Sequence, residues 1–159
     1  MKTLIAFGSK TGTAKKCAQM LRGKLGFGDI VDLSLPMPSI DSYDLVIIGG
    51  SIRMGKLNKY TDNFVKANKE KLKNKRTAFF ICCGDESKAK ATINAVFPSE
   101  LLENAIAARS FGGEIIETSA LDRIFVKMYA KKSKGERPQI NEDAIDAFAK
   151  LIIRKTENG

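Results

Sequence analysis

The fold is decided by the stretch Leu4-Ile5-Ala6-Phe7-Gly8-Ser9-Lys10-Thr11-Gly12-Thr13, near the start of a 159-residue chain. Its first four residues predict a short buried strand, which Gly8-Ser9 ends. The next residues predict a helix, because apolar side chains recur at steps of three and four, at Ala14, Cys17, Ala18 and Leu21. The chain therefore begins with a β-loop-α unit.

Four further apolar runs predict strands over residues 30–33, 45–48, 78–83 and 105–111, with Gly49-Gly50 ending the third and Gly112-Gly113 the fifth. Amphipathic patterns predict helices over residues 57–74, 88–104 with a break near Pro98, about 121–132, and 141–154. Strands that alternate with such helices predict an α/β fold of three layers, with a parallel sheet covered on both faces. Five strands suit the order 2-1-3-4-5.

The composition narrows the class of protein and of chemistry. The chain is 43% apolar and has no repeat or linker, so we expect one domain over residues 1–159. No apolar stretch is long enough to span a bilayer, no signal peptide is expected, and three cysteines without metal-ligand spacing favour a reducing cytoplasm. The absence of histidine removes the usual general base and metal ligand. We therefore expect neither a metal site nor catalytic side chains, and chemistry that a cofactor carries.

The loop Ser9-Lys10-Thr11-Gly12-Thr13-Ala14 is a candidate anion site. It places three hydroxyls and a glycine at a helix N-terminus, where free backbone amides and the helix dipole attract negative charge. It has neither a Walker lysine nor a GxGxxG pattern, which favours a monophosphate. The alternative is an ordinary turn and helix cap.

Residues 4–13 resemble the phosphate signature of flavodoxins, which bind flavin mononucleotide (FMN). The resemblance implies that Ser9, Lys10, Thr11, Gly12, Thr13 and Ala14 surround the FMN phosphate. The family usually has a threonine where this chain has Ala14, and Thr13 comes one position earlier. In sheets of the flavodoxin type, ligands bind beyond the carboxyl ends of the strands, at the switch point between the first and third strands.

Two later loops resemble those that flank the flavin ring. Gly50, Ser51, Ile52, Arg53, Met54 and Gly55 resemble the loop that faces the isoalloxazine, where glycine tolerates unusual backbone angles. Cys83, Gly84 and Asp85 resemble the loop along the pyrimidine side. The alternatives are that Arg53 is a solvated residue on a turn and that Cys82 and Cys83 are buried strand-end residues.

The later motifs, Gly50 to Gly55 and residues 121–127, resemble a branch that includes the quinone-dependent protoporphyrinogen IX dehydrogenases. Three functions remain open. The first is electron transfer by an FMN-binding redox protein with a partner protein, and the second is FMN-dependent oxidation of protoporphyrinogen or reduction of a quinone. The third is a flavin-free, anion-binding interaction module. A receiver domain is excluded because glycine and serine occupy its acidic positions, and no nucleic-acid partner is expected.

The chain is basic, whereas carrier flavodoxins are typically acidic. It has 27 basic and 18 acidic residues, a net charge of +9. Residues 56–76 and 120–139 carry +6 and +4, so the two segments account for the whole excess and the rest of the chain carries −1. The predicted helix over residues 121–132 combines an apolar stripe with lysines. It favours peripheral contact with the inner face of an anionic membrane, or guidance of an acidic substrate such as a porphyrin propionate. The alternative is that the stripe packs on the core and the lysines are solvated.

Overall fold

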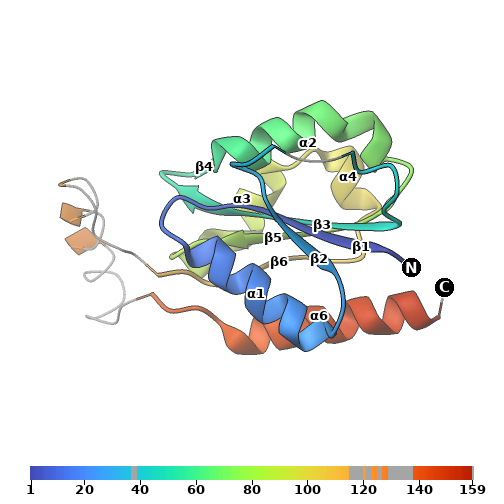
Figure 1. The fold of residues 1–159 in the computed structure, drawn as a ribbon. Helices are drawn as coiled ribbons and strands as arrows, with labels where there is room; N and C mark the ends of the chain where they lie inside the picture. The colour runs from blue at the N-terminus through green and yellow to red at the C-terminus, as the bar shows by residue number, and fades with distance from the viewer. Residues whose placement is uncertain (37–38, 115–119, 121–122, 125–126, 129–137, 159) are drawn as a thin grey trace.

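The computed structural model describes residues 1–36, 39–114, 120, 123–124, 127–128 and 138–158. It has three layers, with a sheet between α1 and α6 on one face and α2, α3 and α4 on the other (Figure 1). The strands are β1 (Thr3–Gly8), β2 (Asp29–Asp32), β3 (Leu45–Arg53), β4 (Lys56–Leu57), β5 (Arg76–Cys82) and β6 (Ala108–Ser110). The helices are α1 (Thr13–Leu25), α2 (Lys59–Leu72), the 3-10 turn η1 (Glu86–Lys88), α3 (Ala89–Val96), α4 (Ser99–Glu103) and α6 (Glu142–Glu157).

The sheet has the expected topology. Its strands lie in the order β2-β1-β3-β5-β6, and all of these neighbours pair in parallel. The short strand β4 pairs only with β3, in the antiparallel direction, so β5 and β6 are the fourth and fifth parallel strands. The order 2-1-3-4-5 expected for the parallel strands is confirmed.

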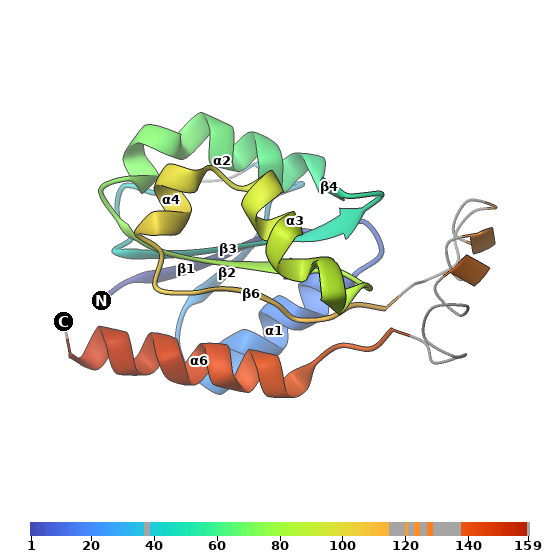
Figure 2. The same cartoon turned by 180° about the vertical axis from the view of Figure 1, so that it is seen from behind.

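Two apolar clusters hold the layers together, one on each face of the sheet. Because side chains alternate along a strand, Ile5 and Phe7 of β1 join the cluster beneath α1 and α6, while Leu4 and Ala6 join the opposite one. Three rings continue the first cluster: Phe80 stacks on Phe111 at 4.7 Å, and Phe111 meets Phe148 edge-on at 5.0 Å between ring centroids. These ring contacts link β5 to α6. Figure 2 shows α6 beside α1 on the same face of the sheet.

The expectation that Gly49-Gly50 ends the third strand is wrong. β3 runs through both glycines to Arg53, with Gly49 paired to Phe7 and Phe80, and Gly50 paired to Gly8 and Ile81. Glycine is needed at these two positions because neighbouring side chains leave no room for a Cβ atom, and not because the chain turns there. A Cβ atom on Gly49 would overlap the Phe80 ring, and one on Gly50 would come within 2.6 Å of the Thr61 hydroxyl oxygen.

Other expected elements are found in shorter form. The interrupted helix over residues 88–104 is present as η1, α3 and α4, with the break at Phe97-Pro98, and the fifth strand narrows to β6. Most of the helix expected over residues 121–132 lies outside the described residues. Within it, Arg123, Ile124, Lys127 and Met128 are helical and exposed. No helix in the described part of the chain has the length and apolar character needed to cross a membrane.

Adding one methyl group tests the packing at the sheet centre. We expect Gly49→Ala to destabilise the fold by about 1–3 kcal/mol, because the Phe80 ring must shift within a close-packed core. Gly23→Ala is the matched control, since Gly23 lies exposed inside α1 with open space around its Cβ position. It should stabilise the protein by about 0.5–1 kcal/mol. Urea unfolding measures both changes, and equal stability of the two variants would contradict the packing described for Gly49.

Candidate functional site

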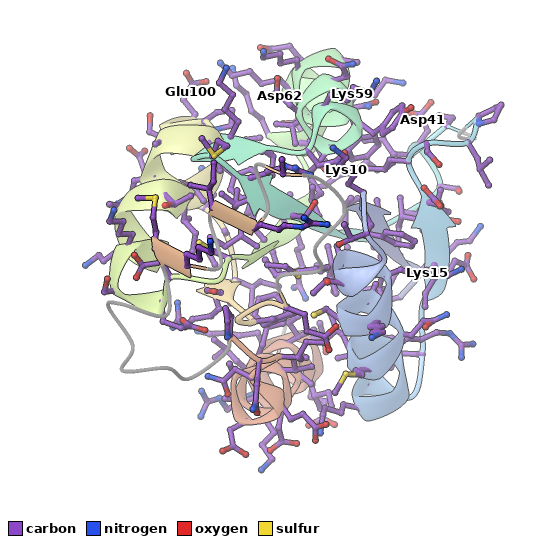
Figure 3. All side chains as sticks on the ribbon, turned by 90° about the vertical axis from the view of Figure 1, so that its left-hand side faces the viewer. Lys10, Lys15, Asp41, Lys59, Asp62 and Glu100 are labelled. Carbon is purple, nitrogen blue, oxygen red and sulfur yellow. The ribbon has the colours of Figure 1, made fainter. Side chains whose placement is uncertain are left out.

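Three loops meet at the carboxyl edge of the sheet. The register pairs Gly8 with Gly50 and Ser51 with Cys82, so β1, β3 and β5 end side by side. Residues 9–12, 52–55 and 83–85 therefore lie at one edge, on the side that faces the viewer in Figure 3. The register thus gathers the three segments that the sequence singled out.

The N-terminus of α1 lacks the groups that usually neutralise a helix start. Its N-cap, Gly12, provides no side-chain hydrogen bond, and its first turn has no acidic residue. In contrast, α2 and α6 each have an asparagine N-cap and at least one acidic residue in the first turn. The first amides of a helix have no partner within the helix, so the start of α1 is suited to an external anion.

The hydroxyl of Thr13 is buried at this helix start without a partner. Thr13 is 3% exposed, and its Oγ1 atom makes no hydrogen bond within the described residues. A buried hydroxyl without a partner costs free energy, which an anion accepting its proton would recover. The Ser9 hydroxyl, for its part, accepts a hydrogen bond of 2.9 Å from the Gly12 amide, which shapes the loop.

The remaining residues of this loop differ in backbone conformation and in burial. Gly12 has φ of 94°, a left-handed conformation that favours glycine, and no atom lies within 4 Å of its Cβ position. Thr11 is half-buried and Lys10 is exposed at the edge. Ala14 is fully buried in the apolar cluster beneath α1, so its methyl group belongs to the core. The space beside Gly12 is therefore open, and Thr13 is buried next to it in the chain.

The second loop is a tight hairpin between β3 and β4. Ile52 pairs with Leu57 and Arg53 with Lys56, which leaves Met54 and Gly55 as the two turn residues. Both have positive φ, 53° and 74°, as in the type I′ turn that suits two-residue hairpins. This conformation is unusual for methionine, and the Met54 side chain is 63% exposed. The hairpin thus presents an apolar side chain to solvent at the edge of the site.

Two polar residues at the start of α2 support the first loop and the hairpin. Thr61 Oγ1 donates a buried hydrogen bond of 3.0 Å to the Gly49 carbonyl. Asn58 Oδ1 accepts one of 3.0 Å from the Tyr60 amide. A Cβ atom on Gly8 would overlap both polar side chains. Sequence reasoning missed these two supporting residues, although an asparagine just before an amphipathic run is a common N-cap signal.

The third loop is braced by its own hydrogen bonds. Cys83 Sγ donates to the Asp85 carbonyl at 3.6 Å, and the Asp85 carboxylate accepts from the Ser87 amide and hydroxyl at 3.1 and 2.6 Å. Burial raises the pKa of the Cys83 thiol. On the opposite face of the sheet, a side-chain hydrogen bond with Cys17, followed by burial, raises the pKa of Cys82. Both thiols therefore stay protonated at neutral pH, which favours structural roles.

A fourth segment, absent from the sequence expectations for the site, packs against this loop. The Cys83 amide donates to the Gly112 carbonyl at 2.9 Å, and a Cβ atom on Gly113 would lie 3.3 Å from the Cys83 carbonyl carbon. The nearby Glu86 carboxyl has its pKa raised by burial, an effect opposed by its hydrogen bond with Ser110. The Gly112-Gly113 pair was the available signal for this close approach of two backbones.

Comparisons with known proteins agree with the fold of the chain. A family model described as a flavodoxin domain matches residues 4–139. The protoporphyrinogen IX dehydrogenase (quinone) of Escherichia coli K12 is 33% identical over 85 residues, which is 50% of this chain and 47% of that protein. The alignment thus spans about half the length of this curated relative.

Solved structures show the same fold at low sequence identity. Oxidised flavodoxin 1 of Bacillus cereus has a TM-score of 0.62 and 17% identity, over 97% of this chain and 98% of that one. Oxidised flavodoxin 2 of the same organism has a TM-score of 0.64 and 18% identity, over 98% and 99% of the two chains.

Removing the N-cap of α2 tests how the edge is supported. We expect Asn58→Ala to lower the free energy of unfolding by about 1 kcal/mol, because the Tyr60 amide loses its acceptor. Asn58→Asp retains an acceptor oxygen and should keep most of the stability. Chemical denaturation compares the three proteins, and a fully stable alanine variant would argue against the cap.

Proposed function

The chain belongs to the flavodoxin domain family, and on that premise we propose that it binds FMN at the carboxyl edge of its sheet and takes part in electron transfer. The observation that carries the proposal is the buried, unpartnered Thr13 hydroxyl at the uncapped start of α1. A dianionic phosphate offers the acceptors that this hydroxyl and the first amides of the helix lack.

In this proposal, one group of residues binds the FMN phosphate and another contacts the flavin ring. Ser9, Thr11, Gly12 and Thr13 would hold the phosphate, with Lys10 adding positive charge at the edge. The hairpin from Ser51 to Gly55 and the loop from Cys83 to Asp85 would flank the ring. Bound FMN supplies one-electron and two-electron transfer. The protein's part is to fix the phosphate and to hold the two loops beside the ring in place. Hydrogen bonds within each of these loops favour a fixed conformation.

A second candidate function is the oxidation of protoporphyrinogen with a quinone as acceptor. The observation that favours it is the 33% identity to a protoporphyrinogen IX dehydrogenase. The alignment covers half of each chain, so it supports the candidate without extending to the rest of that enzyme. We place electron transfer first because it needs no substrate site beyond the cofactor.

FMN titration of the apoprotein, with a Thr13→Val variant, tests the cofactor proposal. Wild-type protein should bind FMN with a shift of the flavin absorption bands. Thr13→Val should weaken FMN binding about tenfold or more, since it removes a hydrogen bond to a charged group. The apoprotein of the variant should be at least as stable as wild type, because the lost hydroxyl has no partner in the described structure.

Riboflavin, which lacks the phosphate, is the control ligand for that titration. Its affinity should be the same for wild type and Thr13→Val. An apoprotein that binds no flavin at micromolar concentrations would refute the cofactor proposal and leave an anion-binding interaction module. An equal loss of riboflavin and FMN binding would mean that Thr13 acts on the fold and not on the phosphate.

Steady-state assays separate the carrier from the enzyme. With protoporphyrinogen IX and a menaquinone analogue, a carrier should show no turnover unless a protein partner is added. Sustained turnover by the FMN-loaded chain alone would instead support the second candidate. Free FMN at the same concentration is the background to subtract, because the flavin carries the redox chemistry itself.

A further inference from the structure

Most lysines along α2 are paired with carboxylates. Lys66 contacts Asp62 at 2.7 Å, Lys71 contacts Asp41 at 2.9 Å, and Lys73 lies 3.0 Å from Glu70. Glu100, on α4, also contacts Lys69 and Lys73 at 3.4 and 3.1 Å. Figure 3 labels the acidic partners Asp41, Asp62 and Glu100. Asp62 and Glu70 are already counted in the net charge of +6 over residues 56–76. Asp41 and Glu100, from outside that segment, reduce this charge to +4.

The lysines at the carboxyl edge differ, because they have no such partners. Lys10, Lys15, Lys56 and Lys59 are exposed, and none forms a salt bridge within the described part of the chain. We call these four residues the basic rim. They come from the first loop, the start of α1, β4 and the start of α2, and Figure 3 shows Lys10, Lys15 and Lys59 on the side that faces the viewer.

Packing brings the elements of the rim together. Gly8, two residues before Lys10, lies against Asn58, which precedes Lys59. Lys56 on β4 pairs with Arg53 on β3. Gly50, also on β3, pairs with Gly8 on β1. The rim therefore borders the loops that would hold the phosphate and the flavin ring.

Two exposed side chains with apolar character lie on the elements that carry Lys56 and Lys59. Met54 at the hairpin tip is 63% exposed, and Tyr60 in the first turn of α2 is 37% exposed. Methionine and tyrosine are enriched in protein interfaces, where methionine adapts its shape to different partners. Exposed side chains of these types beside lysines are suited to a surface that binds a protein partner.

We propose that the basic rim, with Met54 and Tyr60, is a docking surface for a redox partner protein whose contact face is acidic. This inference rests on the proposed function, because it places the partner beside the flavin. Charge complementarity identifies the partner: lysines without carboxylate partners attract a carboxylate-rich face and speed its approach. The Lys59 ammonium lies 5.1 Å from the centroid of the Tyr60 ring, so its charge stays uncompensated by any carboxylate in the described residues. A protein is favoured over a membrane because electron transfer requires close approach to the edge of the cofactor, and the rim lysines border the loops proposed to hold it.

The test compares two charge-reversed variants for binding to a plant-type two-iron ferredoxin, an acidic redox protein. Lys56→Glu/Lys59→Glu alters the rim outside the proposed FMN contacts. Arg154→Glu/Lys155→Glu is the matched control, which changes the net charge equally on exposed residues at the end of α6. Binding of ferredoxin to the apoprotein is measured at ionic strengths of about 0.01 and 0.1 M, where the screening length falls from about 30 to 10 Å.

We expect the rim variant to bind ferredoxin about tenfold more weakly at low ionic strength, and the control variant to bind almost as wild type does. In the FMN-loaded proteins, the rate of reduction by ferredoxin should fall in parallel, with FMN affinity unchanged. Equal losses in both variants would overturn the proposal, since net charge alone would explain them. It would also be overturned if the rim variant lost binding to phosphatidylglycerol vesicles but kept its affinity for ferredoxin. Binding to the apoprotein needs no flavin, so failure of the FMN proposal would be seen separately.

Discussion

The arrangement of the carboxyl edge of the sheet depends on the close approach of α2 to β1 and β3. This approach is possible because glycines, which have no side chain, lie at the contact. Gly8 and Gly50 lie directly against Asn58 and Thr61, and Gly49 lies against the Phe80 ring. Within this space Thr61 bonds the Gly49 carbonyl and Asn58 caps α2. The start of α2, the hairpin and the first loop are thereby held together. This contact fixes where the basic rim and the proposed phosphate site lie.

The parts of the fold that depend on local pattern were predictable from the sequence. The β-loop-α opening and the parallel sheet follow from apolar periodicity. The strand order was expected because five strands suit the order 2-1-3-4-5, which the structure shows. The course of β3 was not, because Gly49-Gly50 reads locally as a break, whereas its pairing with Phe7 and Phe80 decides the outcome. The supporting role of Thr61 depends on the same tertiary contact, which no local signal contains. The residues proposed to bind FMN remain a prediction, since their loops are gathered but their ligand contacts are untested.

Net charge gave an incomplete view of the surface for a related reason. Residues 56–76 form a strongly basic segment in the sequence, yet Asp41 and Glu100, from outside that segment, compensate several of its lysines. Pairing between distant elements cannot be counted along the chain. What matters for a partner is the remainder at the carboxyl edge, where the lysines of the basic rim form no salt bridge within the described residues.

The buried Thr13 hydroxyl also bears on how long the protein persists in a cell. A ligand that satisfies this group only in the folded chain stabilises that chain in proportion to the logarithm of its concentration over its dissociation constant. The ligand-free protein would unfold more often and meet proteases more often. Abundance would then follow the supply of the phosphate-bearing ligand without any regulatory domain, and an empty copy would be cleared before a loaded one.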